Sequence, residues 1–108
     1  MNTLNENRFY VYHHVVNEEF ILNNILYNIG DVVYVGSGQS SRYLSKDRTE
    51  DHLSVFDKLD KIIVKNELTL VDKISIENTE ILKYFDSGKL FNKVKQNSKP
   101  HEILYSVF

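Results

Sequence analysis

Strand-like patterns of hydrophobic and polar residues occur twice in the first third of the chain. Residues 8–16 read RFYVYHHVV and are dense in the β-branched and aromatic residues that favour strands. A period of two divides this stretch into one face with Phe9, Val11, His13 and Val15 and another with Tyr10, Tyr12, His14 and Val16. Residues 31–36, DVVYVG, predict a second strand, antiparallel to the first. Between them we expect a long hairpin connection with a helical turn around Phe20 to Leu26.

The middle of the chain has a helical pattern. Ser40 or Ser41 is a suitable N-cap for a short helix over residues 40–46, SSRYLSK. Thr49 is a suitable cap for a second helix over residues 50–64, which ends at Asn66. The apolar positions of this second helix recur at helical spacing, at Leu53, Phe56, Leu59 and Ile63.

The last third of the chain predicts a third strand and a final helix. Residues 67–76, ELTLVDKISI, alternate between apolar and polar side chains. Ser75 then serves as N-cap of a helix whose buried side holds Ile81, Leu82 and Phe85, and Gly88 serves as its C-cap. Residues 101–108 predict a short strand or a docked tail.

These elements predict a single α+β domain over residues 1–108, with a small three-stranded antiparallel sheet flanked by helices. No cysteine is present, which excludes disulfides and thiolate metal sites. The N-terminal residues 1–7 are polar, and no apolar run is as long as a membrane span. We therefore expect an intracellular, cytoplasmic protein without a membrane partner.

Two tyrosines and a glycine turn carry the first candidate chemistry. Tyr12 and Tyr34 lie on neighbouring predicted strands and are either half-buried sheet aromatics or phenols that take part in proton transfer. Gly36 and Gly38 permit close approach of the backbone, and Arg42 beyond them adds a fork of donors for a phosphate. The alternative is an ordinary tight turn followed by a solvated arginine.

The histidines and carboxylates carry less information. No pair of histidines has the spacing of a zinc site, and His13 and His14 point to opposite faces of their strand. Glu77 and Glu80 occupy neighbouring positions on one face of the final helix. They belong either to a solvated surface or to a site where one carboxylate holds a Mg²⁺ ion that keeps most of its waters.

The order of these features resembles the GIY-YIG endonuclease superfamily. YVY at residues 10–12 and YVG at residues 34–36 stand in the places of its two short motifs. Arg42, Glu80 and Asn92 match its arginine, helical glutamate and terminal asparagine. The chain departs from the pattern because Tyr10 replaces the first glycine and valine replaces isoleucine in both motifs. Arg48 with His52 reproduces the alternative Arg-x₃-His spacing of other members, and Glu77 is the alternative to Glu80.

The resemblance implies a metal-dependent DNA endonuclease, such as a homing or related nuclease of a phage or mobile element. Glu80 would hold one Mg²⁺ or Mn²⁺ ion, and Tyr12 would act as general base. Tyr34 would position the attacking water or share the role of base. Arg42 would stabilise the transition state. The remaining roles are substrate binding by Gly36, Gly38 and Arg48, proton transfer or phosphate binding by His52, and structural support by Asn92.

The net charge of −2 predicts weak general attraction to DNA. We therefore expect a protein partner, a separate DNA-binding domain or self-association on DNA. Two further interpretations of the sequence stay open. One is a non-catalytic phage-type interaction protein that keeps the fold and binds a host factor or nucleic acid. The other is an α/β domain whose glycine turn holds a small phosphate compound.

Overall fold

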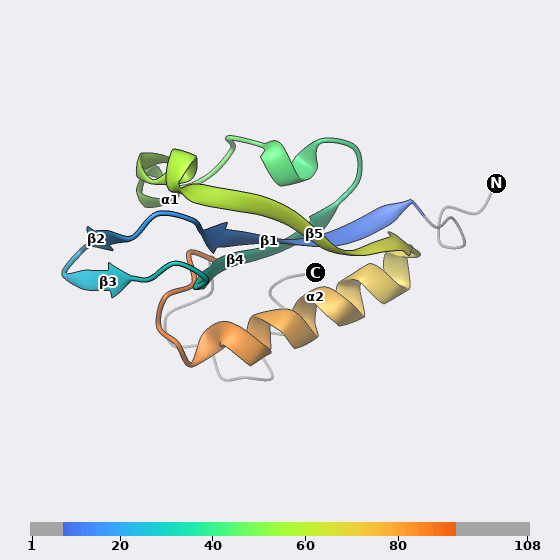
Figure 1. Cartoon of the computed structure of the whole chain (residues 1–108). Helices are drawn as coiled ribbons and strands as arrows, with labels where there is room; N and C mark the ends of the chain where they lie inside the picture. Colours follow the sequence, from blue (N-terminus) through green and yellow to red (C-terminus); the bar gives the residue numbers. More distant parts are fainter. Residues whose placement is uncertain (1–7, 93–108) are drawn as a thin grey trace.

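The computed structural model describes residues 8–92, which form an α+β domain (Figure 1). Its main sheet is antiparallel and has the order β4-β1-β5, built from β1 (Phe9–Val16), β4 (Val32–Gly38) and β5 (Leu59–Leu68). Helix α2 (Leu70–Phe85) lies along one face, and the segment with the 3₁₀ helix η2 (Arg42–Leu44) and helix α1 (Glu50–Ser54) lies on the other. The predicted class and the three-stranded antiparallel sheet are confirmed.

The central strand β1 places its aromatic residues as the period of two predicts. Tyr12 lies opposite Gly36, and His14 lies opposite Tyr34. The rings of Tyr12 and Tyr34 stack with centroids 6.0 Å apart, so the two tyrosines share a sheet face. This face is the one covered by η2 and α1, whereas the alternate residues of β1 meet α2.

The connection between the first two predicted strands is a β-hairpin, which corrects the predicted helical turn around Phe20 to Leu26. Strands β2 (Phe20–Leu22) and β3 (Ile25–Tyr27) pair in an antiparallel ladder. The turn residues Asn23 and Asn24 have φ angles of 53° and 65°. Asparagine tolerates this left-handed region, and consecutive positive φ angles are typical of two-residue hairpin turns.

The predicted helix over residues 50–64 is wrong in its second half. Helix α1 spans only Glu50–Ser54, followed by the 3₁₀ helix η3 (Phe56–Lys58), and β5 begins at Leu59. The run IIV at residues 62–64 is β-branched, and β5 pairs with the free edge of β1. Tertiary pairing with β1 therefore outweighs the helical spacing of the apolar positions. The predicted short helix over residues 40–46 is the single 3₁₀ turn η2, with Ser41 at its N-cap position.

Helix α2 starts earlier than predicted and replaces the strand expected at residues 67–76. Thr69 is its N-cap, and its hydroxyl accepts a hydrogen bond from the backbone N–H of Asp72. Ser75 therefore lies inside the helix. Leu70 and Ile74 are also one helical turn apart, so the pattern does not exclude a helix there. Gly88, with φ of 72°, follows the end of the helix but is not its C-cap, which is Asp86.

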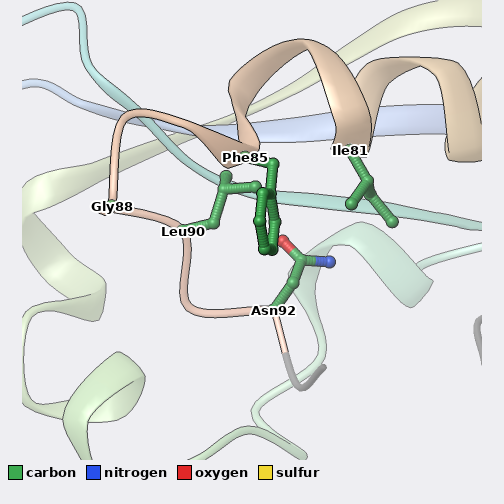
Figure 2. A pocket seen from close by; sticks show the side chains of 5 residues that line it. All are labelled: Ile81, Phe85, Gly88, Leu90 and Asn92. Atoms are coloured by element: carbon green, nitrogen blue, oxygen red, sulfur yellow. The ribbon is translucent and has the colours of Figure 1, made fainter. Parts of the chain in front are cut away.

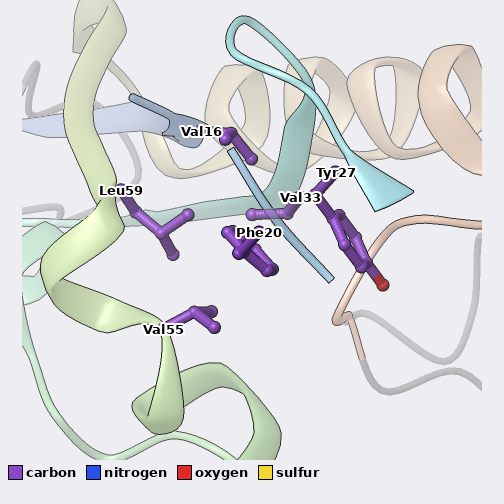
Figure 3. Close-up of a cluster of buried hydrophobic side chains, with 6 residues drawn as sticks. All are labelled: Val16, Phe20, Tyr27, Val33, Val55 and Leu59. Carbon is purple, nitrogen blue, oxygen red and sulfur yellow. The ribbon is translucent and has the colours of Figure 1, made fainter. Parts of the chain in front are cut away.

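Two hydrophobic clusters stabilise the domain. The first lies between the sheet and α2 and contains Phe9, Val11, Val35, Leu68 and Ile81. The second fastens the β2–β3 hairpin to the sheet and to the segment after α1, through Val16, Phe20, Tyr27, Val33, Val55 and Leu59 (Figure 3). No helix within residues 8–92 is long and apolar enough to cross a membrane. The predicted C-terminal strand or tail at 101–108 lies outside the described residues.

Candidate functional site

An arginine and two tyrosines form the centre of the candidate site. Arg48 donates a hydrogen bond from Nη2 to the hydroxyl of Tyr12 across 2.7 Å. Its guanidinium carbon lies 4.7 Å from the ring centroid of Tyr34 and 5.5 Å from that of Tyr12. These are cation–π distances, so the charge of Arg48 is held over both phenol rings.

Backbone carbonyls fix the same guanidinium. Arg48 donates from Nε to the carbonyl of Ser45 across 2.9 Å and from Nη2 to the carbonyl of Arg42 across 3.0 Å. Within residues 8–92, Nη1 has no hydrogen-bond acceptor. Arg48 is therefore oriented by the fold and keeps one amino group for a ligand.

Tyr12 is buried, with a relative exposure of 1%. Burial, supported by the neighbouring Tyr34, raises the pKa of the Tyr12 phenol to about 12, although Arg48 acts in the opposite direction. The phenol is therefore protonated near neutral pH, and its oxygen accepts the hydrogen bond from Arg48. Tyr34, which is less buried, is the phenol that lines the adjoining pocket.

Gly36 and Gly38, which were expected in a turn, lie instead in strand β4, where they make room for side chains of the site. A Cβ atom at Gly36 would lie 2.5 Å from Cζ and Oη of Tyr12. A Cβ atom at Gly38 would lie 2.6 Å from Cγ of Arg42. Both glycines are required because the phenol of Tyr12 and the stem of Arg42 pack directly on the backbone of β4.

A polar pocket of about 250 Å³ opens beside Arg48. It collects four of the residues selected from the sequence: Tyr34, Arg42, Arg48 and His52. The other residues of its lining are Asp47, Thr49 and Phe91. Two guanidinium groups thus face a space with one carboxylate, which suits an anionic ligand.

Two residues that sequence reasoning did not assign to the site support it. The Tyr10 hydroxyl donates to the carbonyl of Ser40 across 2.7 Å and accepts from the backbone N–H of Tyr43 across 3.1 Å. These bonds hold the segment that carries Arg42. His14 contacts His52, with 2.8 Å between His14 Nδ1 and His52 Nε2. The sequence contained one signal for Tyr10 and His14, because the predicted strand places both side chains on the same face as Tyr12.

Glu80, the expected metal ligand, is not brought to the tyrosines. Its Oε1 lies 3.0 Å from Nε2 of His13, on the α2 face of the sheet. Tyr12 and His13 are consecutive in β1 and point to opposite faces. The sheet therefore separates Glu80 from the Tyr12 phenol.

Glu77, one turn earlier in α2, reaches the end of β4 instead. Its Oε1 accepts a hydrogen bond from the hydroxyl of Ser37 across 2.5 Å. Ser37 lies between Gly36 and Gly38 on β4, which is an edge strand of the sheet. Burial raises the pKa of the Glu77 carboxyl, opposed by the Ser37 hydrogen bond and by Lys73.

The side chains of the described residues offer few ligands for a divalent cation. No group of three or more His, Asp and Glu side chains gathers within residues 8–92. Mg²⁺, however, is commonly held by one or two carboxylates and several waters. Glu77 fits this role because its carboxylate is partly buried and its described partner is a neutral hydroxyl. Glu80 fits it less well, because its Oε1 lies 3.0 Å from Nε2 of His13, which becomes a competing cation when protonated.

Asn92 ties the segment after α2 to the strand that carries the second short motif. Its Oδ1 accepts from the backbone N–H of Val35 across 3.0 Å, and its Nδ2 donates to the carbonyl of Val35 across 2.7 Å. Its side chain also borders an apolar pocket of about 310 Å³, together with Ile81, Phe85, Gly88 and Leu90 (Figure 2). Asn92 thus contacts the backbone of β4 and lies outside the polar pocket lined by Arg48.

Comparisons of the chain with protein-family models, with curated proteins and with solved structures find no significant match.

Proposed function

We propose that the chain is a DNA endonuclease with a GIY-YIG-like fold, which binds a phosphodiester at the polar pocket and hydrolyses it. The main support is Arg48, whose guanidinium is held by the Tyr12 hydroxyl and the Tyr34 ring beside a pocket that also contains Arg42. DNA as the substrate comes from the resemblance of the ordered motifs. The pocket itself supports an anionic ligand with a phosphate group.

In this proposal the two arginines bind the phosphate and stabilise the extra negative charge of the pentavalent transition state. Arg48 offers Nη1, because its other donors already bond to protein oxygens. Arg42 lines the same pocket, and within residues 8–92 its side chain makes one long hydrogen bond, of 3.4 Å to the Ser45 hydroxyl. A guanidinium fixed before the ligand arrives needs little reorganisation during the reaction.

The two tyrosines have different roles. Tyr12 positions Arg48 and is a poor general base, because its pKa is about 12 and it is buried. Tyr34 contacts the pocket directly and is the phenol that meets the attacking water. Of the two tyrosines selected from the sequence, Tyr34 is therefore the one that touches the substrate.

Glu77 is the residue that would hold a Mg²⁺ or Mn²⁺ ion, next to Ser37 at the end of β4. The ion, when bound, supplies positive charge for the phosphate oxygens. Glu77 and the phenols lie on the two sides of edge strand β4, at a place where Gly36 and Gly38 have no side chains. We propose that the DNA backbone binds at this edge.

A second candidate function is non-catalytic binding of nucleic acid. The observation that favours it is the Tyr12 phenol, whose burial and high pKa suit hydrogen bonding more than proton transfer. In this alternative the arginines bind a backbone phosphate and no bond is broken.

Relaxation of supercoiled plasmid separates the two functions. The wild-type chain is incubated with plasmid in Mg²⁺ or Mn²⁺, with and without EDTA, and Arg48→Ala serves as the site variant. Nicking that requires the metal and is lost in Arg48→Ala is the expected result. Binding of DNA by the wild type without nicking in either metal supports the non-catalytic function and rejects the nuclease. Neither binding nor nicking rejects both.

A further inference from the structure

Two histidines form a buried hydrogen-bonded chain behind the polar pocket. His14 Nδ1 lies 2.8 Å from His52 Nε2, and His14 Nε2 lies 2.8 Å from the carbonyl oxygen of Tyr43. The relative exposure is 0% for His14 and 1% for His52. Three of the four ring nitrogens of the two histidines therefore have a protein partner. Nδ1 of His52 is the exception, since residues 8–92 supply no partner for it.

Burial keeps both imidazoles neutral. It lowers the pKa of His14 to about 4 and that of His52 to about 3. Arg48 and Lys61 are positively charged and lower the pKa of both histidines further. The rings around the pair are those of Tyr12, Tyr34, Phe56 and Phe91. Within residues 8–92, no carboxylate bonds to either histidine ring.

The positions of the protons follow from the partners. A carbonyl oxygen only accepts, so His14 must carry its proton on Nε2 and donate it to Tyr43. A neutral imidazole has one N–H, which leaves Nδ1 of His14 as an acceptor. His52 must therefore carry its proton on Nε2 and donate it to His14. The lone pair of His52 is then on Nδ1.

We infer that His14 is a positioning residue, which fixes His52 in the Nε2–H tautomer so that its Nδ1 presents a hydrogen-bond acceptor to the arginine-lined pocket. His52 is part of the lining of that pocket, beside Tyr34 and Arg48. The lone pair of this Nδ1 nitrogen repels phosphate oxygens but accepts a hydrogen bond from a neutral donor group. In the proposed nuclease, on which this part of the inference rests, the donor is the attacking water, and His52 orients it next to the phosphate held by Arg48.

The tautomer can be measured without any activity. Long-range ¹H–¹⁵N NMR spectra of the full chain identify which nitrogen of each histidine is protonated, and His52→Gln assigns the His52 signals. At pH 7 we expect His52 as the neutral Nε2–H tautomer, with no change down to pH 5. A His52 that is an imidazolium or an Nδ1–H tautomer at pH 7 overturns the inference, whether or not the chain cleaves DNA.

Two substitutions at His14 test its positioning role. In His14→Gln, the amide can donate to Tyr43 and accept from His52, so the Nε2–H tautomer of His52 should persist. In His14→Phe, both hydrogen bonds are lost, and the Nδ1–H form of His52 should appear. Unchanged His52 signals in His14→Phe contradict the role of His14. If His14→Phe does not fold, loss of the Nε2–H tautomer in folded His14→Gln contradicts it equally.

The activity of these variants separates the inference from the nuclease proposal. If the chain nicks plasmid, His14→Phe should lose about tenfold or more of the nicking rate, as is usual for residues that orient a functional ligand, and His14→Gln should lose less than His14→Phe. If folded His14→Phe nicks plasmid at the wild-type rate although the tautomer of His52 has changed, His52 does not orient the attacking water. If no variant nicks plasmid, the tautomer measurement still decides the role of His14.

Discussion

The hydroxyl of Ser37 donates a hydrogen bond to the carboxylate of Glu77 across 2.5 Å, and this bond joins helix α2 to the glycine-flanked end of β4. The neighbouring carboxylate on the same helix, Glu80, instead meets His13 at 3.0 Å. Two glutamates one turn apart therefore have different surroundings. Only Glu77 lies at the strand end whose other side carries the packed Tyr12 phenol.

Removal of the Tyr12 hydroxyl should weaken DNA binding. Tyr12→Phe keeps the ring but removes the oxygen that accepts from Arg48 at 2.7 Å. A hydrogen bond to a charged group contributes about 1.5–3 kcal/mol, so we expect roughly tenfold weaker binding, measured by fluorescence anisotropy with a labelled duplex. Tyr84→Phe is the matched control, because Tyr84 packs on His13 at the α2 face. Equal affinities of the two variants contradict the role of Tyr12.

An alanine at position 36 should disturb the same contact from the backbone side. The added Cβ would lie 2.5 Å from the end of the Tyr12 ring, which is buried and has little room to move. We expect Gly36→Ala to lower the free energy of unfolding by about 1–3 kcal/mol, the usual cost of overpacking, as measured by urea denaturation. Lys65→Ala, at an exposed position of β5, should change it by less than about 0.5 kcal/mol. Equal stability of the two variants contradicts the packing of Tyr12 against Gly36.

The histidine pair should make the domain less stable at mildly acidic pH. In the unfolded chain histidine titrates near 6.5, whereas the pKa of His14 in the fold is about 4. Below pH 6.5 the unfolded state therefore binds more protons than the folded state, and stability falls as the pH decreases toward 4. One such histidine costs about 1.4 kcal/mol for each pH unit in this window.

Urea denaturation of the wild type and of His14→Gln at pH 7, 6 and 5 measures this contribution. The variant has lost one of the buried neutral imidazoles, so its stability should fall less steeply with decreasing pH. Parallel pH dependence of the two proteins would show that His14 takes up a proton in the folded state as readily as in the unfolded one.

The sequence predicted strands β1 and β4 but neither β5 nor the helix boundaries. The alternation in β1 correctly placed Tyr12 and His14 on one face, because the side chains of a strand have a fixed period of two. The boundary between α1 and β5 was missed, since pairing of residues 59–68 with β1 is a long-range contact that local spacing does not contain. The start of α2 was missed because the local alternation of residues 67–76 resembles a strand, whereas the chain is capped by Thr69 and helical from Leu70.

The candidate site was predicted as a set of residues but not as an arrangement. Arg48 and His52 were identified only by their spacing, and their contacts with Tyr12 and His14 depend on how the segment over residues 42–58 folds back on the sheet. The choice between Glu77 and Glu80 depended on the rotation of α2 about its axis. That rotation is set by packing of Ile81 in the core, which spacing along the sequence does not specify.

The most direct test of the proposed nuclease site compares two isosteric substitutions on α2. Glu77→Gln and Glu80→Gln each remove one negative charge and keep the shape of the side chain. Relaxation of supercoiled plasmid in Mg²⁺ is measured for both variants and the wild type, with circular dichroism to establish that all three are folded. We predict that Glu77→Gln loses about 100-fold or more of the nicking rate, and that Glu80→Gln stays within a fewfold of the wild type. Loss of nicking in Glu80→Gln with retention in Glu77→Gln would contradict the assignment.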